Sequence, residues 1–158
     1  MPLHPLVVHF PIALLLTATV IEIVNLFLKK DFLGKSSTIL FVVGVVTGIV
    51  SYISGDPAEE FAEQKWGEVI ESTVELHETM ALISLIIFGV IAVLKLFGKK
   101  LKLNANLLLA LVVILSIAGS STLAYTGHLG GKMVYESDTL SQSQTDTGNY
   151  ESPDEDED

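Results

Sequence analysis

The sequence predicts an all-α protein: a four-helix transmembrane bundle with up-down topology. The mean hydropathy of +0.53 is too high for a soluble domain of 158 residues, and 49% of the residues are hydrophobic. Four runs each hold about 18 or more mostly apolar residues, which is the length that a helix needs to cross a bilayer. Short basic connections join the first run to the second and the third to the fourth, as between neighbouring antiparallel helices.

Composition narrows the possible functions. The chain has no cysteine, which excludes disulfides, thiolate metal sites and covalent haem attachment. The net charge of -10 arises from acidic segments outside the apolar runs, so we do not expect a nucleic-acid partner. The N-terminus lacks the basic stretch and the small-residue cleavage site of a signal peptide, and the first span is therefore expected to stay in the protein.

The first span is expected at residues 6–28. Pro5 suits the first helical turn, where a missing N–H costs nothing. Pro11 lies deeper, removes the backbone bond to the Val7 carbonyl and predicts a kink next to His9.

A polar stripe follows in the second half of this span. Glu22, Asn25 and Lys29 lie on one face of the helix, at offsets of three and seven residues. We interpret the stripe as a polar cluster at the membrane interface, with Lys29 reaching the aqueous phase. The alternative is a proton or ion path, because ionisable residues inside membrane segments often serve a function.

The second span is expected at residues 37–53 and contains the pair Gly44 and Gly48. Small residues at this GxxxG spacing let two helix backbones approach closely. We expect the contact within the bundle, because a four-helix protein must pack itself before it dimerises. The alternative is an oligomer that forms through these two glycines.

A longer acidic segment, residues 55–73, separates the second and third spans. Asp56 can cap a helix whose first residue is Pro57, and acidic residues in the first turn suit the helix dipole. Phe61 and Trp66 are its apolar anchors. The pattern predicts a short amphipathic helix that lies at the membrane interface between spans two and three.

The third span is expected from about His77 to Phe97, with Lys95 in its last turns reaching toward water. The fourth span is expected to follow a cap at Asn104 and to run to about Tyr125.

The last segment, residues 137–158, has no hydrophobic period and is rich in serine, threonine, aspartate and glutamate. Such a segment cannot bury enough apolar area to offset its ordering entropy. The sequence is therefore expected to divide into a four-helix transmembrane domain, residues 1–136, and a disordered acidic tail, residues 137–158.

Lysines predict the orientation of the bundle. Most of them cluster at the two short connections: Lys29, Lys30, Lys35, Lys95, Lys99, Lys100 and Lys102. Only Lys65 and Lys132 lie on the other side. The positive-inside rule then places the short connections in the cytoplasm and both termini outside. With this topology the four histidines gather at the outer membrane face: His4, His9, His77 and His128.

Several stretches of the sequence resemble those of a known protein family. They are HPLVVHFPIALLL at the start, SGDP after the second span, the histidine that opens the third span, and the closing TGHLGGKMVY. Together they resemble a family of bacterial four-span membrane proteins catalogued as domain of unknown function 2231 (DUF2231). The resemblance covers residues 2–135. The matching motif positions are His4, Pro5, His9, Pro11, His128, Gly130, Gly131 and Tyr135.

The resemblance implies a place in the bacterial inner membrane. It also implies a redox setting, because members are often encoded or fused beside cytochromes and iron–sulfur proteins. Many members continue past the Val-Tyr pair with His-Gly, whereas this chain continues with Glu136, Ser137 and Asp138. If that extra histidine is a ligand in other members, the site of this chain is simpler.

The histidines favour a b-type haem that serves electron transfer, in a small subunit of a larger redox complex or cytochrome. Two neutral imidazoles from facing helices can ligate haem iron axially. We expect His9 and His77 to be the pair, because the first and third helices of an up-down bundle lie diagonally opposite, with His128 as the alternative second ligand. The outer residues of the site would orient a ligand or bind a propionate: His4, Tyr125, Tyr135, Lys65 and Lys132.

Two other functions are alternatives. A non-haem site for zinc, copper or iron could combine three histidines with Glu78, Asp56 or Glu60. His4 and His9 would point about 140° apart on a straight helix, which argues against both binding one ion. The protein could instead be a cofactor-free structural or assembly subunit. We do not expect an enzyme, because no nucleophile is matched with a base.

Overall fold

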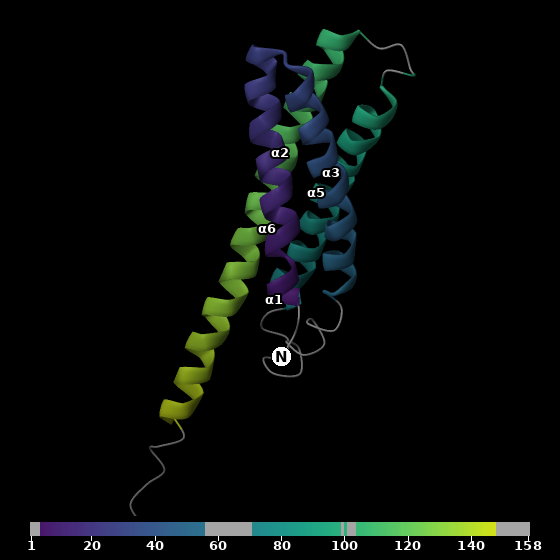
Figure 1. Ribbon diagram of the computed structural model, residues 1–158. Helices are drawn as coiled ribbons and strands as arrows, with labels where there is room; N and C mark the ends of the chain where they lie inside the picture. The colour runs from purple at the N-terminus through teal and green to yellow at the C-terminus, as the bar shows by residue number, and fades with distance from the viewer. Residues whose placement is uncertain (1–3, 56–70, 99, 101–103, 148–158) are drawn as a thin grey trace, which may run out of the picture.

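The computed structural model describes residues 4–55, 71–98, 100 and 104–147 (Figure 1). Within these residues the secondary structure is helical. The helices are α1 (His4–Val7), α2 (His9–Leu28), α3 (Asp31–Ile53), α5 (Glu71–Phe97) and α6 (Ala105–Thr147).

Four of these helices are long and apolar enough to cross a membrane: α2, α3, α5 and the part of α6 from Ala105 to Met133. They form one bundle in which α2 packs against α3 and α6, and α5 packs against the same two helices (Figure 1). The first and third spans therefore lie diagonally opposite, as expected for up-down topology. This arrangement confirms the predicted all-α, four-helix fold.

The bundle is apolar outside as well as inside. Large apolar side chains face outward along its whole length, including Phe27, Phe32 and Ile114. A soluble domain does not carry such a surface, whereas lipid tails solvate it. The buried core is small and includes Leu15 of α2, Phe41 of α3 and Phe88 of α5, the last two stacked with ring centroids 6.0 Å apart.

The first span is interrupted where the sequence predicts a kink. Regular helix stops at Val7 and resumes at His9. Pro11 has no N–H to donate to the Val7 carbonyl, and the neighbouring bond from Ile12 N to Val8 O is long at 3.4 Å. Val8 itself keeps helical backbone angles (φ -62°, ψ -30°), and its N–H donates to the His4 carbonyl at 3.1 Å, so α1 continues into α2 through one weakened turn.

The GxxxG pair packs inside the chain. A Cβ atom at Gly44 would lie 2.7 Å from Leu15 Cδ2, and one at Gly48 would lie 3.1 Å from Leu85 Cδ1. The close approach therefore joins α3 to α2 and α5 within one bundle, as expected. An oligomer through the same glycines stays a prediction.

Three helices differ in length from the sequence expectation. α3 begins at Asp31 rather than near residue 37, α5 already includes Glu71, and α6 continues to Thr147. Hydropathy marks only the part of a helix that crosses the membrane, whereas an existing helix extends without a new nucleation cost. Residues 137–147 are therefore helical where the sequence predicts a disordered tail. The predicted interfacial helix and residues 148–158 lie outside the described residues.

Candidate functional site

One end of the bundle gathers polar side chains from four helices. We call it the histidine end and define it by His4 of α1, Ser54 just after α3, His77 and Glu78 of α5, and Thr126 of α6. The opposite end carries the two short connections and is called the lysine end. Pieces of the sequence motifs that lie far apart along the chain thus meet at one place.

His4 is held by the end of α3. Its Nδ1 lies 3.0 Å from the Ser51 carbonyl oxygen and 3.1 Å from Ser54 Oγ. A carbonyl oxygen can only accept a hydrogen bond, so Nδ1 carries the proton in this arrangement. In the neutral ring, the lone pair then resides on Nε2, the atom that can ligate a metal.

His77 is held in the same way by α6. Its Nδ1 donates to the Thr126 carbonyl oxygen at 3.0 Å, which again leaves the lone pair on Nε2. A Cβ at Gly130 would approach His77 Cε1 to 3.3 Å, so the absence of a side chain at Gly130 lets α6 lie against this ring. His77 also interacts electrostatically with His4 and with Glu78. Both imidazoles are half-buried and lie at the same end of the bundle.

Glu78 links α5, which carries His77, to α3, whose last turn holds His4. Tyr52 of α3 donates its hydroxyl to Glu78 Oε1 at 2.9 Å. This bond fixes the start of α5 against the end of α3, and with it the position of His77 relative to the residues that hold His4.

The other predicted site residues lie further out. His9 and His128 are exposed, and His128 stacks on the exposed Tyr125 with ring centroids 6.5 Å apart. Lys132 is exposed as well. Residue 65 lies outside the described residues, as does the side chain of residue 135.

The arrangement thus favours His4 over His9 as the companion of His77. The physical reason is helical geometry, because Val8 has helical backbone angles and α1 continues into α2. Residues five apart on a helix point about 140° away from each other, so a His4 that faces the bundle leaves His9 facing outward. Sequence reasoning preferred His9 because it lies deeper in the apolar run, and depth does not reveal which way a side chain points.

A three-ligand metal site is not assembled among the described residues. No group of three or more histidine, aspartate or glutamate side chains within them could hold a metal ion. Asp56 and Glu60, which the sequence offers as further ligands, lie outside this part of the chain.

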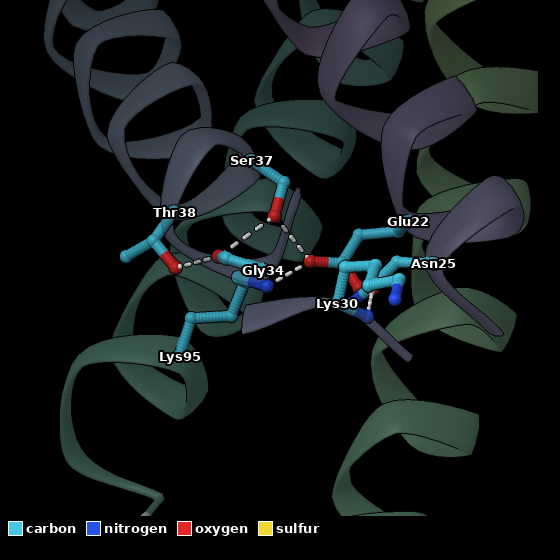
Figure 2. A network of polar contacts seen from close by, with 7 residues as sticks. All are labelled: Glu22, Asn25, Lys30, Gly34, Ser37, Thr38 and Lys95. Atoms are coloured by element: carbon cyan, nitrogen blue, oxygen red, sulfur yellow. Dashed lines mark hydrogen bonds and ion pairs between the residues drawn. The ribbon is translucent and has the colours of Figure 1, made fainter. Parts of the chain in front are cut away.

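A second polar cluster lies near the lysine end and is shown in Figure 2. Lys95 of α5 forms an ion pair with Glu22 Oε1 of α2, and Ser37 of α3 donates its hydroxyl to the same oxygen. The Glu22 side chain is 0% exposed and that of Lys95 only 10%. Asn25 Oδ1 accepts a bond from the Lys30 backbone N–H at 2.8 Å and fastens the turn into α3.

This cluster corrects one sequence-based interpretation, because Lys95 points inward rather than toward water. Glu22 and Asn25 of the stripe are buried in the bundle. Only Lys29 of the stripe is exposed, as expected. The signal that could have revealed the pair is one acid and one base, each isolated in an apolar run at the same end of the bundle, since a buried charge needs an opposite one.

The fold and the four apolar spans define an integral membrane protein built as a four-helix bundle. A family model described as "Predicted membrane protein (DUF2231)" matches residues 1–142, and the chain belongs to this family. This match confirms the resemblance drawn from the sequence motifs. No curated protein and no solved structure matches the chain.

Proposed function

We propose that the histidine end binds a b-type haem and that the protein serves electron transfer in the membrane, as a small subunit of a larger redox complex. The supporting observation is the pair His4 and His77. Each imidazole engages a backbone carbonyl through Nδ1 and so presents Nε2 as the ligating atom. A hydrogen bond from the second ring nitrogen to a carbonyl is the usual support of a metal-binding histidine.

Two histidines suit haem better than a bare ion. A porphyrin supplies four nitrogen ligands to its iron, so the protein needs to contribute only two axial ones. A zinc or non-haem iron site needs three or four protein ligands, which the described residues do not bring together. The haem, when bound, would accept and release one electron.

The residues of this chain have distinct roles in the proposal. His4 and His77 would be the axial ligands, and the carbonyls of Ser51 and Thr126 would fix their ring orientation. Haem propionates would need hydrogen-bond donors or cations at the aqueous edge. Because all nine basic residues are lysines, the candidates are Lys132, Lys65, Tyr125 and Tyr135.

The visible spectrum of the purified full-length protein tests this function. We expect a Soret band, with sharp α and β bands on reduction. His77→Ala and His4→Ala should each lose most of the haem while still inserting into the membrane, since insertion depends on hydropathy. The matched control is His128→Ala, which removes an exposed imidazole and should keep full haem occupancy.

Other spectral outcomes would redirect the assignment. Haem loss in His9→Ala with full occupancy in His4→Ala would return the first ligand to His9. A colourless wild type with stoichiometric metal would favour the non-haem site. A colourless and metal-free protein would contradict both and leave a structural or assembly role.

We further propose that the histidine end faces the periplasm of a bacterial inner membrane. Exposed basic residues at the lysine end support this orientation, among them Lys29, Lys30 and Lys35. The chain has no native cysteine, so labelling of a single introduced cysteine shows the accessibility of that position without background. A cysteine at Glu71 should react with a membrane-impermeant maleimide in intact cells, and one at Lys100, beyond the other end of α5, should react only after lysis. The reverse pattern would invert the proposed topology.

A further inference from the structure

Two polar side-chain atoms of the described residues are buried without a hydrogen-bond partner: Glu22 Oε2 and Ser116 Oγ. Both side chains are 0% exposed. Lipid cannot satisfy such atoms, and unpartnered buried polar groups in native proteins call for an explanation such as a bound water or ion.

Helix register places the two residues at about the same level of the bundle, next to the interface between α2 and α6. One turn away, Ser120 Oγ donates to Thr19 Oγ1 at 3.1 Å and fixes how the two antiparallel helices align. From Thr19 to Glu22 the chain rises about 4.5 Å toward the lysine end, and from Ser120 to Ser116 about 6 Å in the same direction. Both steps also keep the side chain within about 60° of its previous bearing, so Glu22 and Ser116 stay on the shared interface.

We propose that a water molecule bridges Glu22 and Ser116 and that Glu22 is a proton-binding site within the bundle. Glu22 Oε1 already pairs with the Lys95 ammonium and accepts a hydrogen bond from the Ser37 hydroxyl. Oε2 is therefore the oxygen that can accept a hydrogen bond from another donor. Glu22 and Lys95 together carry no net charge. A neutral water preserves that balance, whereas a bare ion would add an uncompensated charge in a medium of low dielectric constant.

The neighbouring polar residues define where a proton would enter the site and in which direction it could move on. Lys95 belongs to the last turn of α5, and its side chain, 10% exposed, is the group that lies between Glu22 and the lysine end, so we place the proton entry on that side. Toward the histidine end, hydroxyl contacts continue along α6. Ser120 pairs with Thr19, and Ser84 donates to Thr122 Oγ1 at 2.9 Å. The row ends beside Thr126, whose carbonyl holds His77.

Few other titratable groups lie near Glu22 and Lys95 among the described residues. α5 contributes Lys95 itself. The first turns of α3 carry Asp31 and Lys35, which are exposed, as is Lys30 before them. In the membrane-spanning part of α6 the titratable residues are Tyr125, His128 and Lys132, which lie in its last third, away from Glu22.

Infrared spectroscopy of the full chain in phosphatidylcholine vesicles tests the proton site. On acidification, over the range in which circular dichroism stays helical, the wild type should gain the carbonyl stretch of a protonated carboxylic acid that Glu22→Gln lacks. Ser116→Ala should shift the frequency of this band, because it removes one anchor of the bridging water. Ser121→Ala is the matched control, since its exposed hydroxyl bonds only the Ile117 carbonyl of its own helix, and it should leave the band in place. If the wild type and Glu22→Gln spectra coincide at every pH, the proton site is refuted.

Thermal unfolding tests the water independently of Glu22 substitutions. If Ser116 Oγ truly lacked a partner, Ser116→Ala would relieve an unsatisfied group and raise the Tm. If a water satisfies it, the same substitution should lower the Tm, whereas Ser121→Ala should leave it nearly unchanged. A raised Tm, or an unshifted carbonyl band in Ser116→Ala, would overturn the bridge.

Discussion

Lys95→Met should lower the free energy of unfolding by about 3–5 kcal/mol, which is the usual cost of removing one partner from a buried ion pair. The substitution keeps most of the side-chain volume and removes the charge. Glu22 is 0% exposed and would keep only the Ser37 hydroxyl on Oε1. It must then either remain charged in apolar surroundings or take up a proton, and both alternatives disfavour the folded state relative to the wild type.

Chemical unfolding in a mixed micelle, followed by circular dichroism, measures this loss. Lys100→Met is the matched control, because that side chain is exposed at the same end of the bundle and lies over the Phe97 ring, 5.5 Å from its centroid. Losing that contact should change stability by about 1 kcal/mol or less. The double variant Glu22→Leu/Lys95→Met should recover much of the loss, since an apolar pair removes the unbalanced charge. Equal stability of Lys95→Met and Lys100→Met would contradict the buried ion pair.

Gly44→Leu should also destabilise the bundle strongly, by about 1–3 kcal/mol or more, because overpacking a well-packed interface forces side chains and backbone apart. A Cβ alone would lie 2.7 Å from Leu15 Cδ2 and 2.9 Å from Leu15 Cγ, so even the first added carbon has no room. Three further carbons would push α3 away from α2.

The control for this prediction is Gly89→Ala in α5. A Cβ there meets nothing within 4 Å, and replacing a mid-helix glycine by alanine should stabilise the helix by up to about 1 kcal/mol. Thermal melting of both variants beside the wild type gives the comparison. A Gly44→Leu variant that melts with the wild type would show that the glycine face looks at lipid rather than at a neighbouring helix.

The four spans, their alternating direction and the polar end were all predictable from the sequence. Hydropathy identifies a membrane helix because the bilayer requires a long apolar surface with its backbone bonds satisfied internally. Pro11 marked the irregular turn at Val8, and the spacing of Gly44 and Gly48 marked a close contact. The motif residues around His4 and His77 also pointed to one end of the bundle.

The partners inside the bundle were not predictable in this way. Which imidazole accompanies His77 depends on how the first helix is rotated about its axis. Lys95 meets Glu22 because the diagonally opposite helices α5 and α2 both turn these side chains toward the inside of the bundle. A hydropathy profile averages over all faces of a helix, so it does not show how the helix is rotated about its own axis. The sequence by itself therefore determined that the chain spans the membrane with helices and places its polar residues at particular depths. Only the tertiary structure decided which of those residues touch, since the rotation of each helix follows from packing against its neighbours.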